Sequence, residues 1–310
     1  MKIVIVTPVP ENYKKEFELP NVEVVYASKK DVTVDLLKDA EVVMGNLPLE
    51  LLLQAPALKW VQLDSAGVGT MAKLPETVQL TNASGAYGEA ISEHMIASAL
   101  AIMKNLYAYY DKQDEHAWDS LGSVSTITSS TVLSIGMGDI GSSFAKKMNA
   151  LGAEVIGIRR HEYELPSYLK AQGTMKDIDT YLPEADIVAL SLPETKETIH
   201  LFDEERLRKM KKGAILLNVG RGSAIESEAL IKVMNEGHLK GVSLDVTEWE
   251  PLPKNHALWR TPNVYITPHI SGRFNAQVTY DKVMNIFITN LKHYLAKESL
   301  EHVVDKKAGY

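Results

Sequence analysis

Three glycines in a fixed spacing are the first feature of this 310-residue sequence that points to chemistry. Gly136, Gly138 and Gly141 stand in the run VLSIGMGDIGSSF, which has the pattern of an apolar strand followed by a helix. In a G-x-G-x-x-G turn the first glycine allows the tight turn, the second lets the backbone approach a pyrophosphate, and the third lets helix pack on strand. The helix N-terminus then faces the anion. The spacing predicts a dinucleotide site, although methyltransferases use a similar turn.

Two adjacent arginines, Arg159 and Arg160, end the next predicted strand, AEVIGIRR. An NAD site holds an acid near this position, where it binds the ribose 2′-hydroxyl. Two guanidinium groups suit the 2′-phosphate of NADP instead, because they can hold it with charge-assisted hydrogen bonds. We therefore expect NADP(H) to be preferred, with NAD(H) as the alternative if Glu162 reaches a ribose. The arginines could equally be a solvated strand end.

Three further predicted strands end in a polar side chain beside a turn. Arg221 stands between glycines in NVGRG, and His269 follows a proline in TPHISG. The run LDVTEWEPLP offers Asp245 and Glu250. Ligands of open parallel sheets bind outside the carboxyl ends of the strands, so we expect these side chains at the same edge as the dinucleotide. Taken singly, each could be a loop charge or a structural histidine, and we interpret the other histidines, His94 included, as surface or packing residues.

The elements that position these residues alternate along the chain. Short apolar runs that end in turn residues predict strands, and amphipathic runs between them predict helices, as in parallel sheets covered on both faces. The predicted strands are 2–8, 22–27, 41–46, 60–67, 78–85, 130–138, 153–160, 185–193, 214–222, 242–248 and 264–270.

The predicted helices include one long stretch. Residues 89–121 contain no glycine or proline and predict one or two helices, apolar nearly all round in the middle. Asp31 is the expected N-cap of one short helix, and Pro48 begins another. Further helices are predicted at 142–152, 226–237 and about 275–298.

Composition excludes several classes of protein. Hydrophobic residues make up 45% of the chain, which is enough for two cores. The net charge of −7 argues against a nucleic-acid or anionic-membrane partner. The absence of cysteine excludes disulfides and thiol catalysis, and we assign no metal site. The start predicts a strand rather than a signal peptide, and residues 95–103 are too short to span a bilayer, so we expect a cytoplasmic protein.

Several motifs in order resemble the D-isomer-specific 2-hydroxyacid dehydrogenase family. GMGDIG, NVGRG, LDVTEWEPLP and TPHISG carry the resemblance. DSAGVGT at 64–70 resembles the family's substrate loop, ISEHMIASALAI its interdomain helix, and SLPETKETIHLF (191–202) its cofactor wall. Trp118 stands where the family usually has a tryptophan. The resemblance runs nearly from end to end of the chain.

The resemblance implies a fold. We expect two doubly wound α/β domains with parallel sheets, one flavodoxin-like and one Rossmann, with the active site in the cleft between them. Residues 1–100 with 276–310 would form the substrate domain, and residues 101–275 the dinucleotide-binding domain. The resemblance also implies a homodimer through the second domain.

The resemblance further implies a reaction, the NAD(P)-dependent reduction of a small 2-keto acid of the glyoxylate, hydroxypyruvate or pyruvate class to a D-2-hydroxy acid. His269 would donate a proton to the carbonyl oxygen, and Glu250 would orient the ring. Arg221 would bind the substrate carboxylate and polarise the carbonyl with a planar group that lysine does not reproduce.

Binding roles follow from the same resemblance. Backbone N–H groups of the substrate loop would take the other end of the carboxylate, from Ala66, Gly67 and Val68. The residues that would contact the cofactor are Gly136, Gly138, Asp139, Ile140, Gly141, Arg159, Arg160, Leu192, Pro193, Thr198, Val219 and Asp245.

Some alternatives stay open at this point. The formate dehydrogenase branch has glutamine where this chain has Glu250, which disfavours formate. No lysine or arginine is expected to face the 64–70 loop, which disfavours a phosphorylated substrate. Asn46 and Leu47 follow a predicted strand and could also face the substrate. A dinucleotide-sensing interaction protein of the same fold is a second reading, and a methyltransferase, which does not require TPHISG or NVGRG, is a third.

Overall fold

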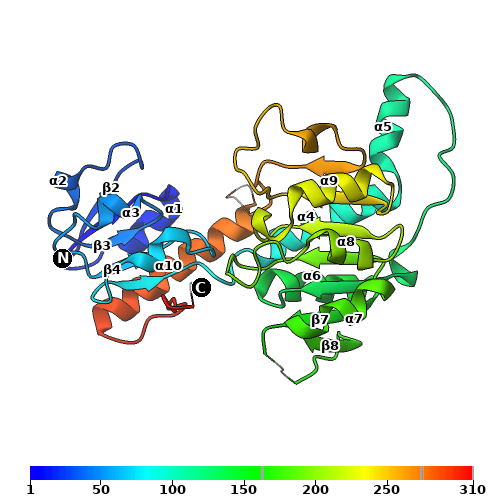
Figure 1. Cartoon of the computed structure of the whole chain (residues 1–310). Coiled ribbons are helices and arrows are strands. Elements are labelled where there is room, and N and C mark those ends of the chain that lie inside the picture. The colour runs from blue at the N-terminus through cyan, green and yellow to red at the C-terminus, as the bar shows by residue number, and fades with distance from the viewer. Residues whose placement is uncertain (162–163, 273, 275, 309–310) are drawn as a thin grey trace. The chain divides into compact units, whose positions relative to one another are not determined.

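The computed structural model describes residues 1–161, 164–272, 274 and 276–308, and they fall into two compact units (Figure 1). Unit 1 comprises Met1–Tyr87 with Ala276–Tyr310, and unit 2 comprises Gly88–Asn275. The sequence analysis placed residues 88–100 in the first domain. Here they form most of helix α4 (Gly88–Met103), which packs along α6 (Asp139–Ala150) of unit 2. The functions assigned to the two domains stay predictions.

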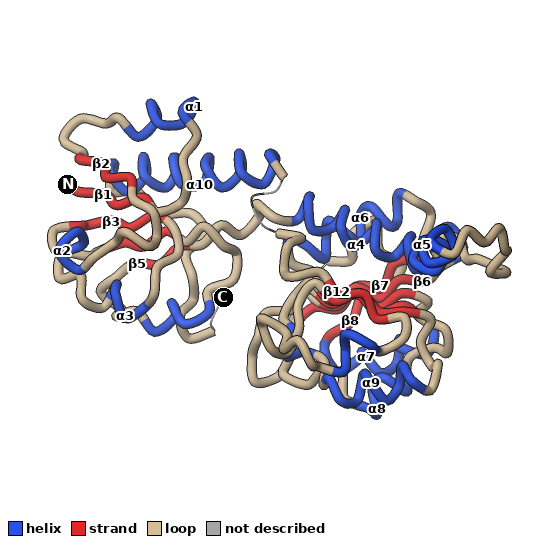
Figure 2. Tube along the Cα trace, turned by 90° about the horizontal axis from the view of Figure 1, so that it is seen from above, coloured by secondary structure: helices blue, strands red, loops and turns tan. Residues whose placement is uncertain are grey.

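Unit 1 is built on a five-stranded parallel sheet in the order β2-β1-β3-β4-β5. This is the flavodoxin-like order, as predicted. Figure 2 shows α10 on one side of the sheet and α3 on the other. The strands are β1 (Lys2–Ile5), β2 (Glu23–Tyr26), β3 (Ala40–Met44), β4 (Trp60–Gln62) and β5 (Gln79–Thr81), and the helices are α1 (Glu11–Lys14), α2 (Val34–Leu37), α3 (Leu49–Leu52) and α10 (Gln277–Ala296).

Unit 2 is built on a seven-stranded parallel sheet in the order β12-β11-β10-β9-β6-β7-β8. Counted within the unit, this is the Rossmann order of a doubly wound sheet, and its switch point lies between β6 and β9. The strands are β6 (Thr131–Ile135), β7 (Glu154–Arg159), β8 (Ala171–Thr174), β9 (Ile187–Leu190), β10 (Ile215–Asn218), β11 (Gly241–Leu244) and β12 (Val264–Ile266).

Helices cover both faces of this sheet. Figure 2 shows α4, α5 and α6 on one side and α7, α8 and α9 on the other. The elements not yet bounded are α5 (Leu106–Asp114), α7 (Ile178–Tyr181), α8 (Glu204–Lys209) and α9 (Ser227–Asn235). The sequence-based fold class of two parallel-sheet α/β units is therefore confirmed. None of the helices in the described part of the chain is both long and apolar enough to cross a membrane.

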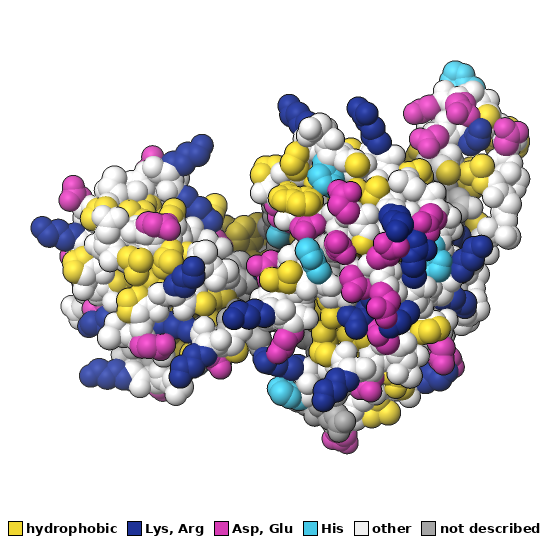
Figure 3. All heavy atoms as spheres, in the orientation of Figure 1, with side chains coloured by type: hydrophobic (Ala, Val, Ile, Leu, Met, Phe, Trp, Pro, Cys, Tyr) yellow, Lys and Arg dark blue, Asp and Glu magenta, His cyan; other side chains and the backbone are white. Residues whose placement is uncertain are grey.

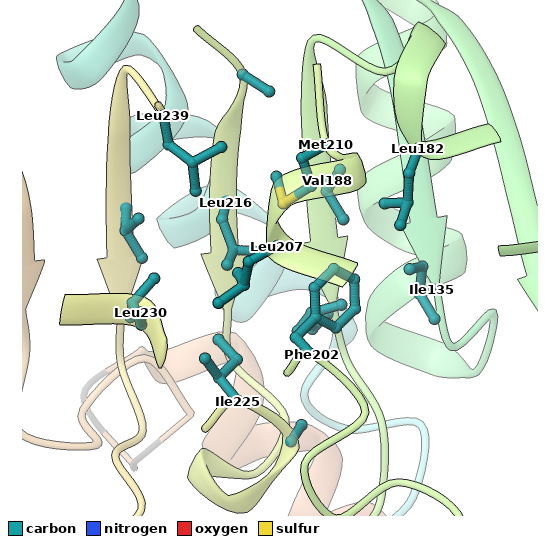
Figure 4. Packing of buried hydrophobic residues seen from close by; sticks show 14 of the residues in the cluster. Ile135, Leu182, Val188, Phe202, Leu207, Met210, Leu216, Ile225, Leu230 and Leu239 are labelled. Carbon is teal, nitrogen blue, oxygen red and sulfur yellow. The ribbon is translucent and has the colours of Figure 1, made fainter. Parts of the chain in front are cut away.

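One core layer of unit 2 lies between its sheet and the helices α8 and α9. Figure 4 shows Phe202, Leu207, Leu216 and Leu230 packed in this layer, and all four are at most 1% exposed. Burying side chains of this kind contributes about 2 kcal/mol each to stability. The outer face over α8 and α9 instead carries interspersed acidic and basic side chains, several of them in ion pairs (Figure 3). Because helices cover both faces of the sheet, the strands of unit 2 are buried and appear in the sequence as continuous apolar runs.

Local signals were partly informative about element boundaries. Pro48 occupies the N-cap position of α3, as expected. The expectation for Asp31 was wrong, since the hydroxyl of Thr33 accepts a hydrogen bond from Leu36 N and caps α2. The predicted helical stretch 89–121 contains two helices that are separated at Asn105, which has a left-handed backbone with φ 55°, and the second helix ends at Asp114, so the prediction was too long. Strand β8 was not predicted, because its short sequence AQGT is only partly buried and lies at the sheet edge.

Candidate active site

The predicted site residues of unit 2 follow the carboxyl ends of neighbouring strands. Because the strands are parallel, the chain leaves all of them at the same edge of the sheet. The first residues beyond the strands extend the ladder across this edge: Gly136 N donates to Ile158 O (3.0 Å), Ser191 N to Ile135 O (3.0 Å), Val219 N to Leu190 O (3.1 Å), Asp245 N to Asn218 O (3.0 Å) and Thr267 N to Leu244 O (2.9 Å). The glycine turn, the cofactor wall and the segments of Arg221, Asp245 and His269 therefore share one edge.

The glycine turn fits a dinucleotide. Gly136 has φ 97°, and a Cβ there would lie 2.7 Å from the carbonyl oxygen of Ser191. A Cβ on Gly141 would lie 2.0 Å from the carbonyl oxygen of Gly136. A Cβ on Gly138 would meet nothing within 4 Å. The first and third glycines thus allow close backbone packing, while the second borders open space at the N-terminus of the twelve-residue helix α6.

The remaining predicted cofactor residues surround this turn. Asp139 begins α6, and its Oδ2 accepts a hydrogen bond of 2.7 Å from Gly88 N, which joins α6 to the start of α4. In the cofactor wall, Thr198 Oγ1 donates to Pro193 O (2.8 Å) and accepts from Thr195 N (2.8 Å). The side chains of three wall and edge residues are largely buried: Leu192, Thr198 and Val219. Ile140, which follows Asp139, is partly buried.

Both arginines stand where β7 ends. Arg159 is the last residue of the strand and is partly buried, whereas Arg160 is exposed. Arg160 Nη2 lies 3.9 Å from Glu197 Oε2 in the cofactor wall, and both side chains are more than half exposed. Glu162, the alternative ribose partner, lies outside the described residues.

Arg221 lies on a tightly packed turn, which we call the arginine loop (residues 219–224). A Cβ on Gly220 would lie 2.6 Å from Leu192 N, and a Cβ on Gly222 would lie 1.9 Å from Thr247 C, so neither glycine has room for a side chain. Asn218 braces the loop, because its amide donates to Arg221 O (3.0 Å) and accepts from Gly220 N (3.1 Å). The sequence analysis missed Asn218, although an asparagine at a strand end beside glycines is a turn signal.

His269 and Glu250 form a direct pair. His269 Nδ1 lies 2.7 Å from Glu250 Oε2, and the other carboxylate oxygen accepts from Thr247 N at 3.2 Å. The two side chains are 47% and 39% exposed, so the pair is accessible from solvent. His269 has φ 51°, in the left-handed region that costs a non-glycine residue roughly 1–2 kcal/mol. Such strain persists only where the surroundings hold it in place.

Asp245 holds the segment that carries His269 (residues 267–271), which we call the histidine segment. Its carbonyl accepts from His269 N (2.8 Å), its Oδ1 from Thr267 Oγ1 (2.5 Å) and Ile270 N (3.0 Å), and its Oδ2 from Ser271 N (3.1 Å). Burial raises the pKa of Asp245, but these hydrogen bonds outweigh burial and leave the pKa below its ordinary value. The carboxylate is therefore ionised at neutral pH and engaged by the segment that carries His269. Its predicted contact with the cofactor stays a prediction.

The predicted substrate loop belongs to unit 1. Four consecutive carbonyl groups accept hydrogen bonds: Asp64 O from Tyr87 OH, Ser65 O from Ala83 N, Ala66 O from Asn82 Nδ2 (2.9 Å), and Gly67 O from Ser65 Oγ (2.7 Å). These bonds fix the backbone of the loop. Within the described part of the chain, no protein group accepts a hydrogen bond from the N–H of Ala66, Gly67 or Val68.

Two expectations about this loop need correction. Leu47 is 3% exposed and packs in the core of unit 1, so it does not face a substrate. Asn46 instead braces the loop, because its Oδ1 accepts from Asp64 N (3.1 Å) and its Nδ2 donates to Ser65 Oγ (3.0 Å). Lys29 Nζ lies 3.7 Å from Asp64 Oδ2, so a lysine does reach the loop. The sequence-based argument against a phosphorylated substrate therefore loses its basis.

A comparison with known families assigns this arrangement. The family described as "D-isomer specific 2-hydroxyacid dehydrogenase, NAD binding domain" matches residues 96–271, which is more than half of the chain. The chain belongs to the D-isomer-specific 2-hydroxyacid dehydrogenase family. It is therefore an NAD(P)-dependent dehydrogenase, and the methyltransferase reading was wrong.

Individual dehydrogenases of the family are similar along most of the chain. A glyoxylate reductase of Thermofilum pendens is 33% identical over 257 residues, which cover 78% of this chain and 72% of that protein. A solved family member from Aeromonas salmonicida is 31% identical, with TM-score 0.89, covering 98% of this chain and 99% of that one. An NADPH-dependent glyoxylate/hydroxypyruvate reductase of Sinorhizobium meliloti, solved with NADP and sulfate, is 26% identical, with TM-score 0.85, covering 100% and 99%.

Proposed function

We propose that this dehydrogenase reduces small 2-keto acids of the glyoxylate, hydroxypyruvate or pyruvate class to D-2-hydroxy acids, with NADP(H) preferred over NAD(H). The observation that carries the proposal is the His269–Glu250 pair, at 2.7 Å, on the sheet edge that also bears the glycine turn and Arg221. The similarity to the glyoxylate/hydroxypyruvate reductase of Sinorhizobium meliloti supports the substrate class.

His269 is the proposed proton donor to the carbonyl oxygen. Its Nδ1 faces Glu250, which leaves Nε2 as the nitrogen that would meet the substrate. Imidazole suits general acid catalysis because its ordinary pKa lies near neutral pH. Glu250 acts by fixing the ring, and the hydrogen bond from Thr247 N fixes Glu250 in turn. A bound nicotinamide cofactor supplies the hydride.

Arg221 is the proposed ligand of the substrate carboxylate. The guanidinium presents two parallel N–H groups to a carboxylate and adds charge that polarises the neighbouring carbonyl. One N–H group already donates to Gly220 O at 2.8 Å, which orients the guanidinium on its own loop. We also propose that the N–H groups of Ala66, Gly67 and Val68 bind the carboxylate.

The preference for NADP(H) rests on Arg159 and Arg160. A 2′-phosphate placed at the end of β7 would meet two cations, because Arg159 and Arg160 stand at the strand end where an NAD site carries an acid. Arg160→Gln should raise the KM for NADPH about ten-fold and leave the KM for NADH within two-fold. Arg260→Gln, an exposed arginine of unit 2, is the matched control.

Initial rates test the whole proposal. NADPH and NADH oxidation are each measured with glyoxylate, hydroxypyruvate and pyruvate, for the wild type and for His269→Ala. We expect turnover that favours NADPH and falls at least 100-fold in the variant. Equal use of both cofactors would remove the role of the arginines. Cofactor binding without turnover on any keto acid would support the interaction-protein reading instead.

We further propose a cytoplasmic homodimer. Figure 1 shows α5 and the loop after it projecting from unit 2. This arm exposes large apolar side chains, since Tyr110 is 62% exposed and Trp118 is fully exposed. Exposed apolar patches mark association sites. Light scattering should give twice the mass of one chain for the wild type and one chain for Tyr110→Ser with Trp118→Ser. A monomeric wild type would contradict the dimer.

A further inference from the structure

Two histidine–glutamate pairs arise from one short stretch of unit 2. Glu250 pairs with His269, while Glu248 Oε1 lies 2.8 Å from His200 Nε2. Both histidines have left-handed backbones, with φ 51° for His269 and 49° for His200. The first pair belongs to the site described above. The second has no role in it so far, although its glutamate is only two residues from Glu250.

Glu248 connects three segments that are distant in sequence. Its Oε1 meets His200 in the cofactor wall, and its Oε2 accepts from Ser227 N, the first residue of α9, at 3.2 Å. Its own backbone leads directly to Glu250. The Glu248 side chain is 17% exposed. Burial raises the pKa of Glu248, but the bonds from Ser227 and His200 outweigh burial and leave the pKa below its ordinary value.

The arginine loop lies between the two partners of this pair. On one side, His200 N donates to Ser223 O at 2.7 Å. On the other side, a Cβ on Gly222 would lie 1.9 Å from Thr247 C and 2.5 Å from Glu248 N, so the loop touches the backbone of the glutamate segment. The bond between His200 and Glu248 therefore joins the two segments that bound the loop.

We propose that His200 and Glu248 are positioning residues that clasp the arginine loop and hold Arg221 in register with Glu250. The inference rests on the proposed function, since the roles of Arg221 and Glu250 are assigned there. In the proposal both residues of the clasp act through the arginine loop and not on the substrate itself. Because His200 is 46% exposed, solvent screens the charge of the pair, so the effect lies in geometry, where a misplacement of about 1 Å costs up to about 100-fold in rate.

Kinetics of single and double variants test the clasp. His200→Gln and Glu248→Gln should each lower kcat/KM for the keto acid about ten-fold, and the double variant should fall no further, because either change opens the same clasp. The KM for the nicotinamide cofactor should stay within two-fold. The matched control is Glu298→Gln in unit 1, whose carboxylate lies 3.9 Å from His293, and it should behave as wild type. Wild-type kcat/KM in both single variants, or losses that multiply in the double variant, would overturn the clasp.

Hydrogen exchange tests it without any substrate. The amides of Ala224 and Ile225 donate to Arg221 O and Gly222 O, at 3.2 Å each, and report on the arginine loop. Glu248→Gln should speed their exchange about ten-fold and leave peptides of unit 1 unchanged. If the wild type reduced no keto acid, the proposed function would fail. The exchange measurement would still show whether His200 and Glu248 hold the arginine loop. Unchanged exchange in the loop, or faster exchange throughout both units, would overturn it.

Discussion

The loops of the two units that carry predicted site residues are held by different kinds of bond. In unit 1, the loop at 64–70 is held mainly by neutral groups, namely the side-chain amides of Asn46 and Asn82 and the loop's own Ser65 hydroxyl. In unit 2, the amide of Asn218 braces the arginine loop, but carboxylates hold His269, because Asp245 binds the segment that carries it and Glu250 binds the imidazole. Neutral bracing keeps its strength over a wide pH range, whereas bracing by carboxylates depends on their ionisation.

A second difference lies in how closely the backbone is packed. At the edge of unit 2, Gly222 leaves no room for a Cβ, and the nearest atoms belong to the backbone of Thr247. In the loop of unit 1, a Cβ on Gly69 would meet nothing within 4 Å, although its φ of 54° is left-handed. The edge of unit 2 therefore tolerates less change than the loop of unit 1.

The largest expected effect sharpens that second difference. Gly222→Ala forces backbone apart, so we expect the free energy of unfolding to fall by about 3 kcal/mol or more and kcat/KM to fall at least 100-fold. Gly69→Ala, the matched change in unit 1, should cost only about 1 kcal/mol. Urea unfolding and initial rates measure both. Equal losses in the two variants would contradict the comparison.

The next effect tests the charged bracing. Asp245→Asn removes the charge that accepts bonds from Thr267, Ile270 and Ser271, so we expect a loss of about 2–3 kcal/mol at pH 7. Because the pKa of Asp245 is lower in the folded state, its contribution is present above the unfolded pKa, near 4, and is lost as pH falls through the folded value. Urea unfolding at pH 7, 5 and 3.5 should show the difference between the variant and the wild type unchanged from pH 7 to pH 5 and beginning to narrow only at the lowest pH.

A smaller effect tests the neutral bracing. Asn82→Ala removes the bond to Ala66 O, so we expect a loss of about 1–2 kcal/mol that is the same at pH 7 and pH 5. The KM for the keto acid should rise several-fold while the KM for the cofactor stays constant. Urea unfolding at both pH values checks the loss of stability, and initial rates check the two KM values. A cofactor KM that rises as much as the keto acid KM would show that the effect is not local to the loop.

The smallest effect concerns the charged contact between Lys29 and Asp64 at the loop of unit 1. Lys29 is 50% exposed and lies 3.7 Å from Asp64, so Lys29→Met should change stability by less than about 0.5 kcal/mol. Thermal unfolding in low and high salt measures this. A loss above 1 kcal/mol that salt abolishes would mean that charge braces unit 1 as well.

Much of the fold could be predicted because the spacing of apolar residues and the position of turn residues are local properties of the sequence. Buried parallel strands read as apolar runs, and each predicted strand corresponds to one observed strand. The missed strand β8 is short, polar and partly buried, so it lacks that signal. Capping of α2 by Thr33 rather than Asp31 is a choice between neighbouring side chains that depends on the path of the backbone.

The site was predictable in part for the same reason. Glycine spacing and the polar residues at strand ends indicated Gly136, Arg221 and His269, and the parallel topology brings the ends of their strands to one edge of the sheet. Two of the braces were missed because Asn82 and Glu248 contact backbone groups that lie close only after folding. Their residue types are common in loops and carry no distinctive spacing.

By itself, the sequence of this dehydrogenase determined which residue types follow which strands, since apolar runs and turn residues specify strand ends locally. Only the tertiary structure decided which side chains those strand ends bring into contact. The pairing of Glu250 with His269 and of Glu248 with His200 depends on strand order and on the close packing at Gly222. Strand order follows from the burial of whole sheet faces, which is a property of the complete chain rather than of any segment.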